Sequence, residues 1–225
     1  MLALSGTTLQ SATVNNIKLG VGALQFTSNS AGNAGEYFQL PQCYIRSNPY
    51  GGATGTYSLL NCIAISYGGV TAVVKFYEPQ GGKGVILSFT NAQYSNSPSG
   101  YTPWIYIGTN GYLYVGDWYG AFLQVSTPIS PGWHTLVATE YYSSGTYYVQ
   151  AWLDGNYIGS ASTTNKPQLF VGGYVSGGNS ATPYGYIATG YTSAWPNTPG
   201  GWWFFNGSIA LIALYPGPPT QAEIN

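Results

Sequence analysis

Residues 132–160 decide the fold, and they read GWHTLVATEYYSSGTYYVQAWLDGNYIGS. This stretch predicts three antiparallel strands in a row, over residues 133–141, over residues 146–153 and from Asn156 onward. Asp154-Gly155 forms the second turn, because both residues tolerate a positive φ. Residues of the middle strand alternate between two faces, which is typical of a strand with one side in a core. One face carries Tyr147, Val149, Ala151 and Leu153, and the other carries Tyr148, Gln150 and Trp152.

Similar patterns predict strands along most of the chain, and Asn110-Gly111 predicts a second hairpin. Residues 174–202 are rich in Gly, Pro, Tyr and Trp, and so long a loop insertion is expected to be functional or locally mobile. Thr220 and Glu223 have the spacing of a capping box, which predicts one short helical turn at the C-terminus and no helix elsewhere. The other expected strands cover residues 17–26, 36–40, 57–66, 70–77, 85–90, 104–108, 111–116, 121–126, 168–173 and 203–215.

These elements predict an all-β chain that folds as a two-sheet antiparallel β-sandwich. The 225 residues could form two small domains, but sandwiches of this size are often one domain. Hydrophobic residues make up 44% of the chain, which is enough for a sizeable core. We therefore expect a single domain over residues 1–225.

Charged side chains are unusually scarce, at 5% against roughly 25% in ordinary soluble domains. The five Lys and Arg residues are scattered and the net charge is −1, so nucleic acid is not an expected partner. Apolar runs are shorter than the roughly 20 residues of a membrane span, so no membrane insertion is expected. Residues 1–6 lack the positive region of a signal peptide. Either a signal was removed, or the protein leaves its cell another way, for instance inside a virion.

The small number of carboxylates predicts that stability depends only weakly on pH. Acid unfolding is mostly the protonation of carboxylates that are paired in the native state. Heat-adapted proteins usually contain more ion pairs, not fewer, so the low charge points toward an acid-exposed, extracellular setting. The six carboxylates are Glu36, Glu78, Asp117, Glu140, Asp154 and Glu223.

Cys43 and Cys62 are the two cysteines of the chain, 19 positions apart. A disulfide that closed this loop would stabilise the fold by roughly 3 kcal/mol in the chain-entropy model. The alternative is two buried thiols that act as small apolar side chains. Sequence spacing leaves both alternatives open, since it does not show whether the two Cβ atoms face each other.

Several segments, in chain order, resemble the motifs of the concanavalin A-like lectin/glucanase superfamily, in its laminin-G-like or pentraxin-like branch. The segment 70–77 resembles a strand of that superfamily, and 110–113 resembles its Asp-Gly-Lys-Leu hairpin. The segments 132–138, 151–159 and 205–215 resemble its Gly-Trp-His-His-Val-Ala strand, its Asp-Gly hairpin and its closing strand. Ala210 departs from the acidic residue common at that point. The resemblance implies a jelly roll, a fold that carries lectins, enzymes, adhesion modules and capsid parts.

Catalytic residues are not evident in the sequence. Glycosidases need two carboxyl groups about 5 to 9.5 Å apart, and no two carboxylates here are two positions apart on a strand. Asp117 and Glu140 could meet only through folding. His134, the one histidine, is expected to be a strand residue rather than a general base. No Cys/His cluster predicts zinc, and a calcium site built from Asp117 and backbone carbonyls stays open as a minor alternative.

Aromatic side chains of the loops are the better candidates for binding. Aromatic faces can stack on the C–H groups of a sugar, and such a site needs little charge. The same rings could instead dock against a neighbouring subunit or simply cover the surface. All three alternatives stand at this point. The candidate ligand-binding residues are Trp104, Asp117, Trp118, Tyr119, Tyr184, Tyr186, Tyr191, Trp195 and Trp202.

The favoured interpretation is a non-catalytic structural or recognition protein on the outside of a cell or virus particle. Its expected partners are glycans or neighbouring subunits, including copies of itself in an oligomer or particle. The setting that the charge count favours is a virus or archaeon in hot acid. The alternative is a glycoside hydrolase, or another glycan-cleaving enzyme of the same superfamily.

Overall fold

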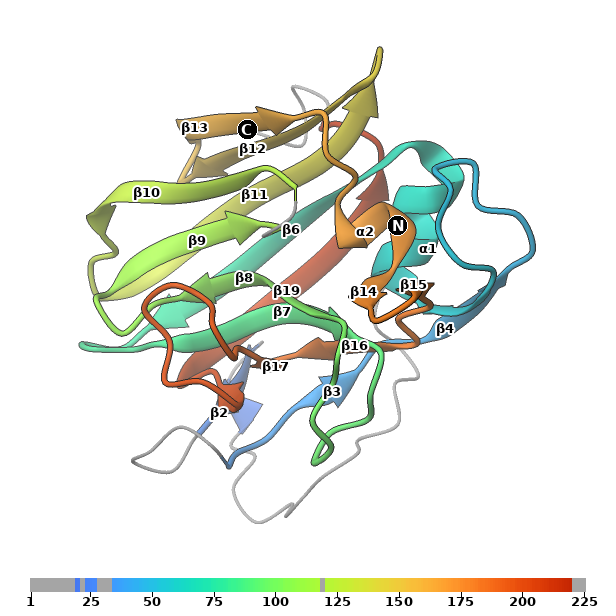
Figure 1. Ribbon diagram of the computed structural model, residues 1–225. Helices are drawn as coiled ribbons and strands as arrows, with labels where there is room; N and C mark the ends of the chain where they lie inside the picture. The colour runs from blue at the N-terminus through green and yellow to red at the C-terminus, as the bar shows by residue number, and fades with distance from the viewer. Residues whose placement is uncertain (1–18, 21–22, 28–33, 118–119, 220–225) are drawn as a thin grey trace.

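The computed structural model describes residues 19–20, 23–27, 34–117 and 120–219, and it is a sandwich of two antiparallel sheets (Figure 1). The two-sheet β-sandwich predicted from the sequence is therefore confirmed. The predicted helical turn over residues 220–223 lies outside the described residues.

The first sheet has seven strands, and the three predicted around the Asp154-Gly155 turn form one edge of it. Asp154 and Gly155 both have positive φ, at 53° and 76°, as the hairpin requires. The strand order is β1 (Leu19–Gly20), β2 (Ala23–Phe26), β19 (Gly207–Pro216), β6 (Gly69–Glu78), β11 (Gly132–Ser143), β12 (Thr146–Leu153) and β13 (Asn156–Thr163).

The second sheet has eight strands, built around the predicted Asn110-Gly111 hairpin. Its main path is β10 (Phe122–Pro128), β9 (Tyr112–Gly116), β8 (Tyr101–Ile107), β7 (Gly84–Thr90), β16 (Tyr184–Ile187) and β3 (Phe38–Gln39). Off this path, β18 (Trp202–Phe204) pairs with both β17 (Thr189–Tyr191) and β7. Two small hairpins complete the fold: β4 (Gln42–Ile45) with β5 (Gly55–Ser58), and β14 (Gly173–Val175) with β15 (Gly178–Ser180).

The main hydrophobic core lies between the inner faces of the two sheets. The predicted inward face of β12 is confirmed, because Tyr147, Val149 and Ala151 are buried in this core. Facing them across the sandwich are buried residues of the other sheet, among them Ile105, Leu113, Val115 and Leu123. Burial of such side chains supplies the main favourable term in folding.

Two helices overturn two of the predicted strands. Residues 57–66, predicted as a strand, contain most of α1 (Leu59–Tyr67), and residues 168–173 contain α2 (Gln168–Val171). The Ser58 side chain caps α1 by accepting a hydrogen bond from the Asn61 N–H, and Gly68 ends the helix at φ 76°. The β-branched and aromatic side chains suggested strands, but these local capping signals decided the outcome.

The disulfide between Cys43 and Cys62 forms, with the two Cα atoms 6.2 Å apart. It joins β4 to α1. Of the two alternatives that the sequence left open, the bridge is confirmed. It anchors the helical end of the sandwich to a small hairpin that belongs to neither main sheet.

Residues 174–202 are not one long loop. They include β15, β16 and β17 and parts of β14 and β18, so the predicted loop insertion was wrong in this respect. Two aromatic clusters involve this segment and the eight-stranded sheet. One contains Val85, Tyr106, Tyr114, Trp195 and Trp203, and the other contains Tyr37, Tyr186 and Phe204. The aromatic residues therefore cover a sheet.

The outer face of the seven-stranded sheet is more open. Its strand register places Tyr77 beside Trp133, and the two rings are 5.6 Å apart. Both are well exposed, as are Tyr157 and Leu211 on the same face. Four large apolar side chains on one sheet face make a candidate contact surface.

Candidate functional site

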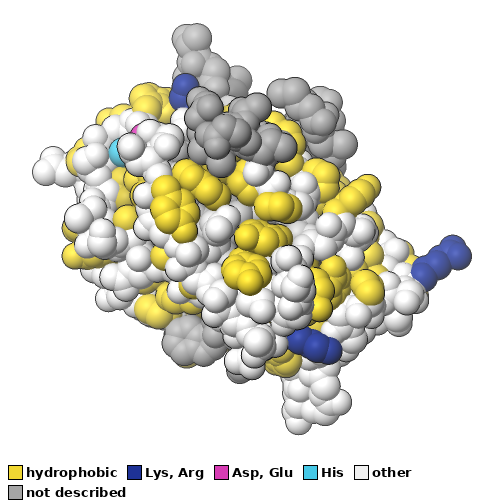
Figure 2. Space-filling view, turned by 90° about the horizontal axis from the view of Figure 1, so that it is seen from above, with side chains coloured by type: hydrophobic (Ala, Val, Ile, Leu, Met, Phe, Trp, Pro, Cys, Tyr) yellow, Lys and Arg dark blue, Asp and Glu magenta, His cyan; other side chains and the backbone are white. Residues whose placement is uncertain are grey.

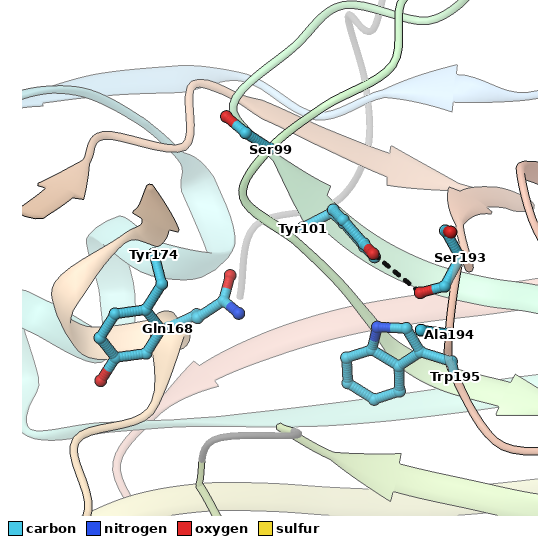
Figure 3. A pocket seen from close by; sticks show the side chains of 7 residues that line it. All are labelled: Ser99, Tyr101, Gln168, Tyr174, Ser193, Ala194 and Trp195. Carbon is cyan, nitrogen blue, oxygen red and sulfur yellow. Dashed lines mark hydrogen bonds between the residues drawn. The ribbon is translucent and has the colours of Figure 1, made fainter. Parts of the chain in front are cut away.

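A pocket of about 170 Å³ lies between α2 with β14 on one side and the start of β8 with the 193–195 turn on the other (Figure 3). It is smaller than the roughly 300–1,000 Å³ of sites for drug-sized ligands, so it fits one small group. The lining residues are Ser99, Tyr101, Gln168, Tyr174, Ser193, Ala194 and Trp195. None of these side chains carries a charge at neutral pH.

Tyr101 forms the wall at the start of β8. Its hydroxyl donates a hydrogen bond to the Ser193 carbonyl oxygen at 2.8 Å, which ties β8 to the turn opposite (Figure 3). Its ring contacts Tyr191 edge to face, with the ring centres 4.9 Å apart. Both contacts fix the ring and the backbone of this wall.

Tyr174 on β14 forms the opposite wall, and a glycine pair sets its distance. A Cβ on Gly173 would lie 2.5 Å from the Gly100 Cα, and the reverse contact is equally short. Only two glycines allow the backbones to approach so closely. Tyr101 and Tyr174 directly follow these two glycines, so the close approach brings both rings to the pocket.

Gln168, at the start of α2, is the most buried polar side chain of the lining, with 4% of its surface exposed. Its Oε1 is buried and has no hydrogen-bond partner in the described part of the chain. Figure 3 shows the side chain extending between Tyr174 and Trp195. A buried acceptor without a partner is costly, and native structures rarely keep one without a reason.

Polar side chains hold α2 in place from two directions. The Asn61 Nδ2 donates to the Leu169 carbonyl oxygen at 2.9 Å, and the Asn48 Nδ2 donates to the Phe170 carbonyl oxygen at 2.8 Å. From the opposite side, the Asp117 carboxylate accepts a hydrogen bond from the Leu169 N–H at 3.1 Å. These bonds fix the backbone that carries Gln168.

Two carboxyl groups distant in the sequence meet in the core beside α2. Asp117 follows β9, Glu140 lies on the inner face of β11, and both are fully buried. Burial raises the pKa of Glu140 well above its usual range, the nearby Asp117 carboxylate raises it further, and the Trp104 hydrogen bond lowers it. Trp104 donates that bond from Nε1 to the Glu140 Oε2 at 2.8 Å. Folding therefore unites Asp117 and Glu140, but in the core and not in an open cleft.

Metal ligation has little support among the described residues. They contain no group of three or more His, Cys, Asp or Glu side chains that could hold an ion. Both ring nitrogens of His134 have hydrogen-bond partners within the protein. Its Nδ1 lies 2.7 Å from the Asp154 Oδ2, and its Nε2 lies 2.7 Å from the Ser130 carbonyl oxygen. It is a well-bonded residue of β11.

The structure places the predicted ligand-binding residues in different environments. Trp195 lines the pocket, and Tyr191 supports it through Tyr101. Trp104, Asp117 and Tyr186 are fully buried, and their role as ligand-binding residues stays a prediction.

Two further candidates are taken up by packing. Trp202 and Tyr184 pack around Tyr186, and the Trp202 Nε1 donates to the Asn96 carbonyl oxygen. Both are still partly exposed, so their role as ligand contacts stays a prediction. Trp118 and Tyr119 lie outside the described residues.

Sequence reasoning missed most of the pocket. Gln168 was assigned to the strand predicted over residues 168–173. The position of Tyr174 depends on the contact between Gly100 and Gly173, which are far apart in the sequence. Pro167 before the helix and Gly172 after it are the local signals that could have revealed α2. The rest of the lining is Ser99, Ser193 and Ala194.

Comparisons with known proteins match the fold alone. No protein-family model and no curated protein sequence matches the chain. Among solved structures, the chain is similar to a heptameric SAP-like pentraxin from Limulus polyphemus, at 12% identity and a TM-score of 0.45, over 92% of this chain and 82% of that one.

Two further structures are similar to the same extent. The CBM40 of Ruminococcus gnavus IT-sialidase, bound to α2,3-sialyllactose, is 14% identical with a TM-score of 0.45, over 83% of this chain and 95% of that one. An endo-1,3-β-glucanase from Streptomyces sioyaensis is 12% identical with a TM-score of 0.44, over 93% of this chain and 82% of that one. These similarities are too distant to assign the chain to a family, and they carry no conclusion about its activity.

Proposed function

We propose that this β-sandwich protein acts without catalysis, as a recognition protein that binds a glycan through the pocket between α2 and the 193–195 turn. The observation that carries the proposal is the lining: Tyr101, Tyr174 and Trp195 surround a single amide, Gln168. Aromatic rings with one or two fixed polar groups are the composition expected of a small-molecule site. The carboxyl pair that could perform hydrolysis is fully buried.

The surface chemistry supports the proposal of an extracellular or virion-surface setting. Charged side chains make up only 5% of the chain, and the salt bridge between His134 and Asp154 is an ion pair only when the histidine is protonated. Figure 2 shows apolar side chains gathered in the middle of the face seen from above, with Lys and Arg side chains toward its margins. A surface that depends so little on charge suits exposure to acid, as on a particle or cell in an acidic medium. No described helix has the length and apolar character of a membrane span.

A glycan array carrying neutral and acidic sugars, probed with the whole protein, tests the recognition function. Binding of a defined sugar class by the wild-type protein supports it. Tyr174→Ala should lose this binding, whereas Tyr157→Ala, which removes an equally large exposed ring from the distant β13, should keep it. An array on which the wild-type protein binds nothing overturns the glycan function.

A glycan-cleaving enzyme is the second candidate, and one observation favours it. Burial and the nearby Asp117 carboxylate raise the pKa of Glu140, as is typical of the general acid in a glycosidase. Release of reducing ends from a bound glycan, abolished in Glu140→Gln, would establish this activity. An unchanged glycan after long incubation favours recognition without catalysis.

A further inference from the structure

We infer that the pocket selects a neutral, hydroxyl-bearing sugar over an acidic one, and that Gln168 is the residue that makes the polar contact. This inference rests on the proposed function, since it names the ligand class and the contacting group of the same site. Three features of the pocket carry it: the unpartnered amide, the aromatic walls and the distribution of charge.

The unpartnered amide is the first feature. Only 4% of the Gln168 surface is exposed, and its Oε1 has no hydrogen-bond partner among the described residues. The terminal torsion of glutamine is broad and two-fold, so either end of the amide can face the pocket. An amide offers one acceptor and a two-fold donor side by side, which matches two adjacent hydroxyls of a sugar. A ligand that reached the Oε1 would satisfy an acceptor that the described residues leave unpaired.

The aromatic walls are the second feature. Tyr174 stands on one side of Gln168, and Tyr101 and Trp195 stand on the other (Figure 3). Each ring is held by the protein: Tyr101 through Ser193, and Tyr174 through its hydroxyl, which donates to the Lys166 carbonyl oxygen. Fixed rings on both sides of an amide accommodate the C–H faces of a pyranose while its hydroxyl edge meets Gln168. The volume of about 170 Å³ restricts the contact to one sugar unit.

Charge is the third feature, and it decides against an acidic sugar. Among the described residues that line the pocket there is no Lys, Arg or His. Lys166 is near in sequence, but its Nζ lies beside Gly51, 3.0 Å from the point that a Cβ would occupy there. Asp117 lies beside α2, where its carboxylate accepts a hydrogen bond from the N–H of Leu169, the residue next to Gln168. A bound carboxylate would lack a cation and would lie on the same side as an existing negative charge.

Solution NMR of the whole protein tests the inference through the Gln168 side-chain amide. The probes are the methyl glycosides of glucose, galactose, mannose and N-acetylneuraminic acid. We expect at least one neutral glycoside to shift the Gln168 amide signals in a saturable way, and the acidic glycoside to bind at least about tenfold more weakly. Gln168→Ala should weaken the neutral sugar about tenfold, as expected for loss of its hydrogen bonds.

Gln150→Ala is the matched control, because it removes the same amide from the outer face of β12. It should leave affinity unchanged, and a thermal melt of both variants excludes unfolding as the cause. Array binding that survives Gln168→Ala overturns the inference and leaves the proposed function standing. If the acidic glycoside bound as tightly as the neutral ones or more tightly, the inference would likewise be overturned and the proposed function would stand. A wild-type protein that binds no sugar by either method overturns both.

Discussion

At the residue scale, Glu140 is the group whose chemistry the fold changes most. Its pKa is raised in the folded protein, so the folded state holds a proton that the unfolded state releases once the pH passes the usual glutamate value. Its contribution to stability is therefore fully present below that value and is lost as pH rises through the folded pKa. Glu78, whose pKa burial also raises, acts in the same direction.

We therefore expect the melting temperature to hold or rise as the pH is lowered from 7 toward 4. Glu140→Gln should flatten this dependence, because the amide keeps an acceptor for Trp104 and cannot ionise. Thermal unfolding followed by circular dichroism at several pH values measures the melting temperature of the wild type and of the Glu140→Gln variant. Asp154→Asn, which changes a partly exposed carboxylate outside the core, is the control and should leave the Glu140 effect in place. A steep fall of the melting temperature in mild acid would contradict the expectation.

At the element scale, the disulfide and the glycine pair each hold one small element against the sandwich. The bridge from Cys43 to Cys62 fixes β4 to α1, and α1 in turn positions α2 through Asn61. The contact of Gly100 with Gly173 holds β14 beside β8. Both devices act on the helical end of the molecule, where the pocket lies.

Removal of the disulfide by the double change Cys43→Ser and Cys62→Ser should cost about 3 kcal/mol of unfolding free energy, since the bridge closes a loop of 19 residues. This corresponds to a fall in melting temperature of about 6–12 °C for a chain of this size. Calorimetry of the oxidised protein, the reduced protein and the variant gives the measurement. A variant with the same melting temperature as the oxidised wild type would show that the disulfide does not stabilise the fold.

Gly173→Ala should damage the pocket more than the fold. The new Cβ would meet the Gly100 Cα at 2.5 Å, so β14 must move away from β8 and carry Tyr174 with it. We expect sugar binding to weaken at least about tenfold, and the melting temperature to fall by about 2–12 °C, since such overpacking costs roughly 1–3 kcal/mol. Val175→Ala, which trims the same strand, should retain binding. If the Gly173→Ala variant retained sugar binding, the contact of Gly100 with Gly173 would not be needed to position Tyr174.

At the scale of the whole molecule, the aromatic side chains divide between two tasks. On the eight-stranded sheet they are covered by the segment 174–202 and by each other. On the outer face of the seven-stranded sheet, two aromatic side chains and a leucine stay exposed: Trp133 by 49%, Tyr77 by 38% and Leu211 by 43%. The exposed face is the surface that we propose for contact with neighbouring subunits.

Trp133→Ser should weaken self-association, because Trp133 is the large aromatic at the centre of this exposed group. Tryptophan is enriched among interface residues that dominate binding energy. Sedimentation velocity over a concentration series should show association of the wild-type protein and a shift toward monomer in the variant. Tyr67→Ser, which removes an exposed ring at the end of α1, is the control. Wild-type protein that stays monomeric throughout would count against this surface.

Sequence alone was sufficient for most strands of the two sheets, because local chemistry sets them, but it missed β16 and β17 in the segment predicted as a loop. The period of two in β12, the Asp154-Gly155 and Asn110-Gly111 turns, and the β-branched run in β6 each specify a strand or a turn within a few residues. The same local reasoning failed at α1 and α2. There the side chains favour strands, while the Ser58 cap and the flanking Gly68 and Gly172 favour short helices.

Only the tertiary structure decided the site. Gln168, Tyr101 and Trp195 come from segments far apart in the chain, and their distances depend on how α2, β8 and the 193–195 turn pack together. The burial of Asp117 with Glu140 depends in the same way on two sheets facing each other. Turn and strand preferences act over a few neighbouring residues, and so the sequence determined the sandwich. A pocket requires side chains from distant segments to converge, and that convergence exists only once the sheets are stacked.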